Sequence, residues 1–344
     1  MSQKRTTNLN SPLAYDYDLP SSLIATKPAE PKESANLLVY ERQNNKISHL
    51  KFGDLAEILP KCDIIFNDTK VVKARIYGTK NSGGKIELLL NRPLNDDKFS
   101  VYIKGSVKVG TWLNFNLNLK ALVIELFDDG SRVVKFYKEQ KILDVNELFE
   151  YLEKIGHIPL PPYIKREDTL KDTKWYQSIF AKNSGAVAAP TASLHFSPQM
   201  IETLTKNHDI YYLTLHVGAG TFKSVEVSDI REHKMHSEWF DIPDKTAEIL
   251  RSDKPILGVG TTVTRVVENF VRKDVKTGEC ELFLNYLNRP QRQNFLLTNF
   301  HLPKSTLIML VSSFIGYEKT MEIYKLSVEK KYKFYSYGYA MLIL

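Results

Sequence analysis

The sequence predicts a protein of two structural types, an α/β body and a small all-β domain. The chain has 344 residues, enough for one large domain or two ordinary ones, and 43% of them are hydrophobic, as is typical of globular proteins. Short strand-like runs separated by turn signals fill residues 71–139. After residue 168 helical and strand-like segments alternate, which favours strands covered by helices.

The first part of the chain, up to about Lys51, is loop-rich. Two prolines within residues 27–34 precede a strand-like run at residues 36–42, so an extended arm packed on the body is expected. Residues 63–68 are apolar and then polar, which is typical of a buried strand that ends in a loop.

The strand-rich block indicates a small β-barrel or sandwich. Gly83-Gly84 and Asp129-Gly130 fit hairpin turns. A helix is expected over residues 145–155, and the proline-rich residues 158–168 should form a rigid connector. The block is therefore an insertion into the α/β body or a lobe beside it.

The second half should contain the α/β elements. Strands are expected at residues 211–217 and 254–260, and helices at residues 198–206, 244–252, 264–273 and 306–314. Ser197 is placed to cap the first of these helices, with Pro198 at its first position. Thr261 or Thr262 is expected to cap the third after a glycine turn.

Composition limits the class of protein. Lys and Arg number 47 against 40 Asp and Glu, a net charge of +7 that suits a polyanionic partner without requiring one. Cys62 and Cys280 form neither a disulfide framework nor a metal-binding spacing, which favours a reducing compartment. No apolar N-terminal stretch or membrane-length run is present, so export and membrane insertion are not expected.

Two loops are candidates for binding small anionic or sugar groups. His195 precedes a helix start, where backbone N–H groups favour anions, although an ordinary buried loop explains the same residues. Gly218 and Gly220 follow a strand and would allow a ligand to approach the backbone. The dinucleotide-binding fingerprint is absent because Lys223 occupies the place of its third glycine.

The most suggestive acid/base cluster lies in residues 231–239. His233 and His236 share a face if the segment is helical, whereas His236 and Glu238 share one if it is extended. A metal site is the rival interpretation, since imidazole and carboxylate are ordinary zinc ligands. His301 and Lys304 stand at the start of another helix, but Pro303 rules out a P-loop.

The C-terminal segment, residues 330–344, interleaves lysines with aromatic residues. Such a pattern can bind phosphates and stack on exposed bases, or it can form a C-terminal strand with a basic face.

Taken together, the motifs resemble those of one family, the S-adenosylmethionine:tRNA ribosyltransferase-isomerases of queuosine biosynthesis. The resemblance covers almost the whole chain. Its marks are DYDLPSSLIATKP, FNDTKVVKARIYG, GGKIELLL, GAVAAPTASLHF, LHVGAGTFKSV, HKMHSEWF, GVGTTVTRVVE, LLTNFHLPKSTLIMLVS and FYSYGYAMLIL.

The resemblance implies a fold and a reaction. The fold is an α/β barrel-like body, residues 1–70 and 151–344, with an inserted small antiparallel β-barrel at residues 71–150. The family transfers and isomerises the ribosyl part of S-adenosylmethionine onto 7-aminomethyl-7-deazaguanine at the wobble position of tRNA. The products are epoxyqueuosine, adenine and methionine.

The resemblance also implies partners and location. Expected partners are S-adenosylmethionine, as a consumed co-substrate, and the anticodon loop of tRNAs with a GUN anticodon. A cytoplasmic monomer is expected, with no membrane partner, no metal and no permanently bound cofactor.

Site residues follow from the motifs and the chemistry. Proton transfer requires acid/base groups within hydrogen-bond reach of the substrate, and the candidates are His195, His216, His233, His236 and Glu238. Asp68, Thr69 and Arg265 are expected to orient the ribose hydroxyls or the methionine carboxylate. Further substrate-binding candidates are Gly218, Gly220, Thr261, Thr262, His301, Lys304 and Tyr337.

The chain differs from the usual sequence of the family at a few positions. Tyr339 stands where the family generally has Asp, and Ser193 where it usually has Gly. Two other classes stay open at this point: a metal-dependent hydrolase using His233, His236 and Glu238, and a noncatalytic RNA-binding homologue.

Overall fold

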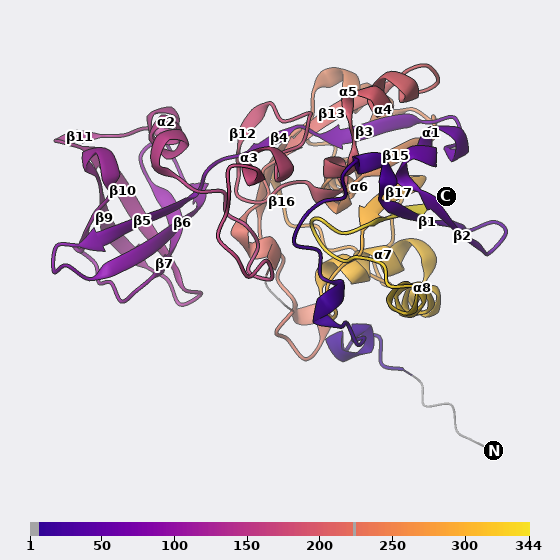
Figure 1. Cartoon of the computed structure of the whole chain (residues 1–344), viewed down its shortest axis with the longest axis horizontal. Helices are drawn as coiled ribbons and strands as arrows, with labels where there is room; N and C mark the ends of the chain where they lie inside the picture. The colour runs from indigo at the N-terminus through magenta and orange to yellow at the C-terminus, as the bar shows by residue number, and fades with distance from the viewer. Residues whose placement is uncertain (1–6, 223–224) are drawn as a thin grey trace.

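The computed structural model describes residues 7–222 and 225–344 and divides the chain between a β-barrel and a larger α/β body (Figure 1). The barrel strands follow one another along the chain, whereas the body takes strands from both sides of them. The prediction of an α/β body with an inserted antiparallel β-barrel is therefore confirmed.

Six strands close the barrel in the order β10-β7-β6-β5-β8-β9, because β9 also pairs with β10. Strand β11 only extends the edge of β10. Side chains that alternate along the strands, such as Leu88, Val101 and Phe136, fill the interior. The strands are β5 (Arg75–Lys80), β6 (Lys85–Pro93), β7 (Phe99–Lys104), β8 (Trp112–Asn114), β9 (Leu119–Leu126), β10 (Ser131–Lys138) and β11 (Lys141–Ile142).

Glycines form the two predicted hairpin turns. Gly83 lies between β5 and β6 and Gly130 between β9 and β10, each with a φ of +87°, a region that favours glycine. The antiparallel pairing of β5 with β6 and of β9 with β10 confirms both hairpins.

Helix α2 (Val145–Ile155) has the bounds expected from the sequence. Asp144 and Glu147 form a capping box at its first turn. Leu148 and Leu152 pack into the barrel core, so α2 belongs with the barrel and crosses the predicted boundary between residues 150 and 151. The boundary itself stays a prediction.

Nine strands form one mixed sheet in the body. Strand β3 runs parallel to both of its neighbours, β13 and β15, and all five of its residues are buried. Such strands are apolar along their length because both faces are covered. In spatial order the sheet contains β16 (Thr277–Cys280), β14 (Glu238–Asp241), β13 (Ile210–Leu215), β3 (Asp63–Asn67), β15 (Ile256–Val259), β17 (Phe295–Asn299), β18 (Ala340–Ile343), β1 (Asn36–Glu41) and β2 (Lys46–Lys51).

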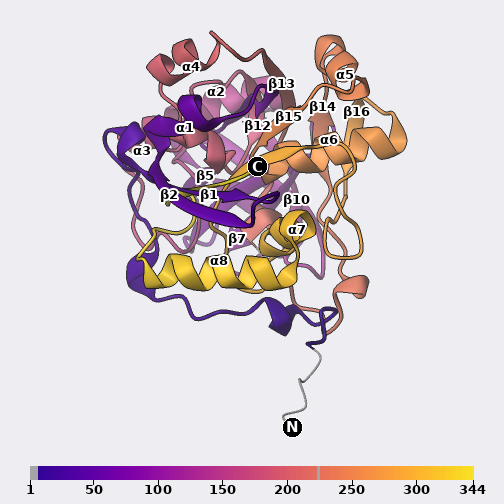
Figure 2. The same cartoon turned by 90° about the vertical axis from the view of Figure 1, so that its right-hand side faces the viewer.

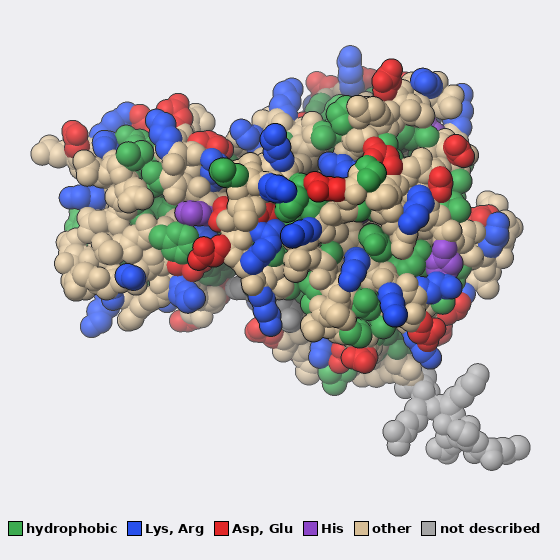
Figure 3. All heavy atoms as spheres, in the orientation of Figure 1, with side chains coloured by type: hydrophobic (Ala, Val, Ile, Leu, Met, Phe, Trp, Pro, Cys, Tyr) green, Lys and Arg blue, Asp and Glu red, His purple; other side chains and the backbone are tan. Residues whose placement is uncertain are grey.

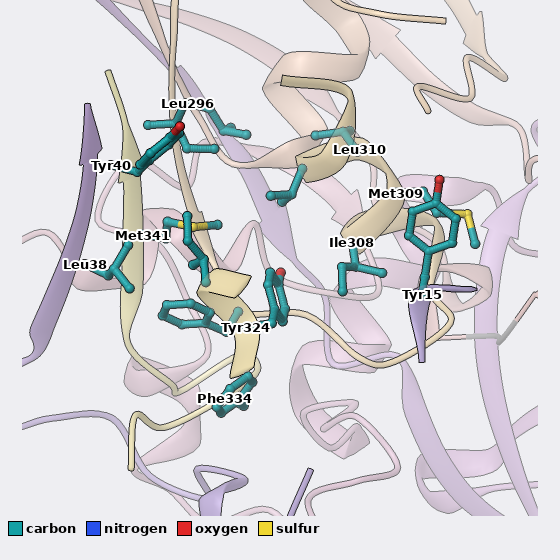
Figure 4. Packing of buried hydrophobic residues seen from close by; sticks show 14 of the residues in the cluster. Tyr15, Leu38, Tyr40, Leu296, Ile308, Met309, Leu310, Tyr324, Phe334 and Met341 are labelled. Carbon is teal, nitrogen blue, oxygen red and sulfur yellow. The ribbon is translucent and has the colours of Figure 1, made fainter. Parts of the chain in front are cut away.

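Helices cover both faces of this sheet (Figure 2). Helices α7 (Thr306–Ile315) and α8 (Tyr317–Glu329) lie on one face, and α1 (Leu55–Ile58) and α4 (Pro198–Leu204) lie on the other. Leu296 of β17 packs with α7 and α8 (Figure 4), whereas the next residue, Leu297, packs with α1 and α4. The remaining elements are α3 (Asp172–Trp175), α5 (Asp244–Arg251), α6 (Thr261–Lys273) and the short parallel pair of β4 (Thr69–Val71) and β12 (Asn183–Ala186).

The four helices predicted in the second half are confirmed as α4, α5, α6 and α7. Ser197 caps α4 as expected. The predicted cap of α6 is wrong, because this helix begins at Thr261 and its N-cap is Gly260, with a φ of +95°. No side chain caps the first turn of α6.

Segments near both ends of the described chain pack on the body. Tyr15, from the predicted arm, is fully buried in the cluster around α7 and α8 (Figure 4). Tyr332 and Phe334 are also buried there, and β18 lies inside the sheet. The base-stacking interpretation is therefore wrong for Tyr332 and Phe334, whose rings lie in the core. None of the helices in the described residues has the length and apolarity needed to cross a membrane.

Candidate active site

A glycine loop at residues 217–221 follows strand β13 and His216. Gly220 must lack a side chain, because a Cβ there would lie 2.6 Å from Cδ2 of His236. A Cβ on Gly218 would lie 3.3 Å from the Asn91 side chain, which is also tight. The two glycines thus allow a histidine and a barrel side chain to pack directly on the loop backbone.

The loop separates two cavities. Val217 and Thr221 line one of them, of about 810 Å³, which we call the inner cavity; its other walls include residues 188–192, 260–262 and 298–303. Gly218 and Gly220 line the other, of about 1890 Å³, which we call the interdomain cleft. The cleft lies between barrel residues 91–96 and body residues that include 236–239. One short loop is therefore a common wall of both.

The inner cavity has an uncharged lining. Its described lining residues include no Asp, Glu, Lys or Arg. Thr261 and Thr262 bring the uncapped first turn of α6 to its wall, and such a helix start favours an anionic group. Burial lowers the pKa of His301 to about 3, and its Nε2 lies 2.9 Å from the Thr298 hydroxyl. A neutral imidazole therefore faces this cavity at physiological pH.

Two aromatic rings form another wall of the inner cavity. Tyr163 and Tyr335 stack with ring centroids 4.3 Å apart. Tyr335 has a φ of +71°, which is unusual for a residue with a side chain. The Asn299 amide donates a hydrogen bond of 3.0 Å to its carbonyl oxygen and so helps to hold this conformation.

Two histidines line the interdomain cleft. The ring of His216 stacks on Trp239 at 5.0 Å, and its Nδ1 lies 2.8 Å from the Thr69 hydroxyl. Burial lowers the pKa of His216 to about 4, so the ring is neutral at pH 7. His236 is exposed in the cleft and packs against Gly220. A neutral, half-buried imidazole and an exposed one thus line the same cleft beside the glycine loop.

A buried ion pair fixes the loop from beneath. Glu238 accepts hydrogen bonds from the Gly218 amide at 3.1 Å and the Thr221 hydroxyl at 3.0 Å. The guanidinium of Arg265 pairs with the same carboxylate and also donates to the carbonyl oxygens of Cys280 and Leu282. Both members of the pair are about 5% exposed. The geometry makes this pair an anchor for the loop.

The other predicted residues lie outside both cavities. His195 stacks on Phe52 at 4.8 Å, and its Nε2 accepts a hydrogen bond from Asn299, which does line the inner cavity. Burial lowers its pKa to about 3. Asp68 accepts hydrogen bonds from Thr214 and Asn183, at the end of β3.

Three candidates are occupied by contacts elsewhere. His233 packs edge-on against Phe283, Lys304 pairs with Asp16 at 3.1 Å, and the Tyr337 hydroxyl donates to the buried Asp172 at 2.9 Å. The structure therefore groups Thr261, Thr262 and His301 in the inner cavity and His216, Gly218, Gly220, His236 and Glu238 in the cleft. The predicted roles of all these residues stay predictions.

Comparison with known proteins identifies the family. Residues 13–343 match the family model described as queuosine biosynthesis protein. The chain belongs to this family. A relative from Campylobacter fetus, named S-adenosylmethionine:tRNA ribosyltransferase-isomerase, is 65% identical, and the match covers 96% of this chain and 98% of the relative. One from Campylobacter concisus with the same name is 62% identical, over 98% and 100% of the two chains.

A solved structure supports the same assignment. The crystal structure of an S-adenosylmethionine tRNA ribosyltransferase from Thermotoga maritima is 30% identical, with a TM-score of 0.54, and the match covers 96% of this chain and 100% of that one. The family and enzyme class expected for this chain from its motifs are thus confirmed: it is a ribosyltransferase-isomerase of the queuosine biosynthesis family.

The departures from the usual wording of the queuosine biosynthesis family lie away from the cavities. Tyr339 packs edge-on against Tyr332 with ring centroids 5.8 Å apart and lines neither cavity. Ser193 is fully buried, and its hydroxyl has no hydrogen-bond partner among the described residues. Ser193 belongs to the packed interior, and Tyr339 is half-buried against the hydrophobic core.

Sequence reasoning missed several residues that build the site. Thr221, Asn299 and Tyr335 stand within or beside the motifs quoted for the queuosine biosynthesis family, so their motif context was an available signal. Asn91, on the barrel, directly follows the motif GGKIELLL and had the same kind of signal. In the described ranges, 7–222 and 225–344, no group of three or more His, Cys, Asp or Glu side chains is arranged to hold a metal ion, so the rival metal interpretation gains no support.

The buried histidines predict a pH dependence of stability. His195 and His301, with a pKa of about 3, and His216, with a pKa of about 4, are neutral in the folded chain, whereas an unfolded histidine has a pKa of about 6.5. These neutral histidines contribute fully to the free energy of unfolding above pH 6.5. The contribution is lost as the pH falls, because the unfolded chain then binds more protons than the folded chain. Each histidine should lower the free energy of unfolding by up to about 1.4 kcal/mol per pH unit between pH 6 and 5.

Urea denaturation at pH 7, 6 and 5 measures this effect. Unfolded carboxylates bind few protons in this range, so histidines dominate the slope. A free energy of unfolding that stays constant from pH 7 to 5 would contradict the buried, neutral state of these rings.

Proposed function

We propose that the inner cavity binds S-adenosylmethionine and that the interdomain cleft receives the modified base of tRNA. The ribosyl group then passes directly from S-adenosylmethionine to the aminomethyl group of 7-aminomethyl-7-deazaguanine where the two sites meet beside loop 217–221, with isomerisation to epoxyqueuosine and release of adenine and methionine. The observation that carries this proposal is the common wall, since the two reacting groups must meet at one place.

The lining of the inner cavity suits a nucleoside. Tyr335 and Tyr163 offer aromatic surface for a purine. The uncapped start of α6, at Thr261 and Thr262, suits the methionine carboxylate, which needs hydrogen-bond donors rather than a charged lining.

The interdomain cleft suits an unstacked nucleotide. It is the larger of the two cavities, and Phe127 and Trp239 on its walls are 45% and 38% exposed. RNA-modifying proteins commonly hold a splayed base on such rings. Lys and Arg side chains gather on the body beside the barrel (Figure 3), where they would meet the phosphate backbone.

Proton transfer is assigned to the histidines of the cleft. A neutral His216 can accept a proton at pH 7, and the exposed His236 lies across Gly220 from the inner cavity. Glu238, with its carboxylate engaged by Arg265 and the loop, positions these groups in this proposal. Arg265 accordingly acts through Glu238 and not by binding the methionine carboxylate.

The remaining features follow from the family resemblance. We propose that the substrates are tRNAs with a GUN anticodon, that the enzyme works in the cytoplasm as a monomer, and that S-adenosylmethionine is consumed without a permanently bound cofactor.

Adenine release from S-adenosylmethionine in the presence of tRNA that carries the precursor base tests the proposal. We expect release that requires this tRNA and that persists in EDTA. Loss of activity on chelation would favour the metal-dependent hydrolase, and tRNA binding without adenine release would favour the noncatalytic homologue.

A further inference from the structure

We infer that Asn91, from the β-barrel, is a positioning residue that holds loop 217–221 in its reactive conformation. The inference rests on the proposed function, because it assigns the barrel a part in the reaction at that loop. Asn91 also lies on the wall of the interdomain cleft, and in this inference it acts through the loop backbone.

Asn91 lies at a β-bulge of strand β6. On β6, Leu90 pairs with Val101 of β7, and Arg92 pairs with Ser100, the preceding residue of β7. Two consecutive residues of β7 thus face two residues of β6 that are not consecutive, and Asn91 is the extra residue between them. Bulges of this kind re-aim a side chain and are frequent beside active sites.

The re-aimed side chain bonds the glycine loop. Asn91 Oδ1 accepts a hydrogen bond of 3.1 Å from the backbone N–H of Ala219. Its Nδ2 donates to the Ser100 hydroxyl at 3.3 Å, which fixes the amide orientation. A Cβ at position 218 would lie only 3.3 Å from Asn91 Oδ1, so glycine there keeps the approach open.

Packing supports the same contact. The side chain of Ala219 lies against the hydrophobic core of the barrel. The residues on either side, Gly218 and Gly220, line the interdomain cleft, and Thr221 lines the inner cavity. The barrel thus holds the loop from one side through Asn91, while Glu238 and Arg265 hold it from the other.

Loss of the Asn91 acceptor should let the loop shift. His216 immediately precedes this loop, and His236 packs on Gly220, so a shift would misplace both proposed proton-transfer groups. Misplacement by about 1 Å can cost on the order of 100-fold in rate. The expected effect is on kcat with little change in KM for S-adenosylmethionine, because Asn91 is not among the residues that line the inner cavity.

Two Asn91 variants and one control test the inference. Asn91→Leu keeps the size of the side chain and removes the acceptor, and we expect kcat for adenine release to fall roughly 10- to 100-fold, with KM for S-adenosylmethionine within about threefold of wild type. Asn91→Asp keeps an acceptor for Ala219 and should restore kcat to within about threefold of wild type. Asn114→Leu, the same change on β8 where Asn114 bonds only Asn81, should leave kcat unchanged.

Hydrogen exchange of the Ala219 amide gives a readout that needs no activity. It should accelerate about tenfold in Asn91→Leu and stay slow in Asn91→Asp and Asn114→Leu. If Asn91→Leu does not fold, Asn91→Ala takes its place. Wild-type kcat in the acceptor-less variant, or failure of Asn91→Asp to restore kcat, would overturn the inference. Absence of adenine release from the wild-type chain would instead overturn the proposed function, and exchange would still report on the contact.

Discussion

Replacing His236 with asparagine is expected to reduce adenine release by about 10²- to 10⁴-fold, the range typical of a lost acid/base group. His236 is exposed in the interdomain cleft and packs on the glycine loop, so its removal should leave folding intact. The measurement is single-turnover adenine release with tRNA carrying the precursor base, together with the urea midpoint.

A matched control is His49→Asn. His49 bonds the hydroxyl of Tyr332 and lines neither cavity, so turnover should be unchanged. Full activity in His236→Asn would remove this histidine from the mechanism and leave His216 as the cleft candidate.

Replacing Arg265 with methionine is expected to lower the free energy of unfolding by about 3–5 kcal/mol, because it leaves the carboxylate of Glu238 buried without its cation. Urea denaturation measures the loss. The double variant Arg265→Met with Glu238→Leu removes both charges and should recover part of the lost stability.

Activity measurements distinguish the contribution of this pair to stability from its contribution to holding loop 217–221. In the double variant the Gly218 amide and the Thr221 hydroxyl still lose their acceptor, so adenine release should remain low while stability recovers. A loss of stability below about 1 kcal/mol in Arg265→Met, or full activity in the double variant, would show that the pair does not anchor the loop.

Local signals predicted much of the fold. The bounds of α2, the Ser197 cap of α4 and the glycine turns at Gly83 and Gly130 depend on neighbouring residues, which a single sequence displays directly. The change from short strands to alternating helices and strands likewise separated the barrel from the body.

The construction of the site depends on contacts that are distant in the chain. Arg265 lies 27 residues after Glu238, and Ala219 lies 128 residues after Asn91, so no local spacing indicates either contact. From the sequence alone, Arg265 is expected to be free to bind a substrate carboxylate. In the structure it pairs with Glu238, which holds the loop. Tyr337 similarly reads as an exposed aromatic until the buried Asp172 is placed beside it.

Glycine loops were the best sequence guide to the cavities. Gly218, Gly220 and Gly260 all lie on cavity walls, each at a point where a side chain or a helix start comes close to the backbone. A glycine indicates that another group comes close to the backbone, but it does not indicate which residue that group belongs to. The barrel's contribution to the site depends on the hydrogen bond between Asn91 and Ala219, which the glycines alone do not indicate.

The central claim is that the two substrate sites flank loop 217–221 and bring their reacting groups together beside it. A crystal structure of the protein with an amine analogue of S-adenosylmethionine, which lacks the sulfonium, and an anticodon stem-loop carrying 7-aminomethyl-7-deazaguanine tests it most directly. We predict the analogue between Thr261 and Tyr335 and the modified base beside Trp239, on opposite sides of the loop. Both ligands within one cavity, or the base bound away from the cleft, would contradict the account.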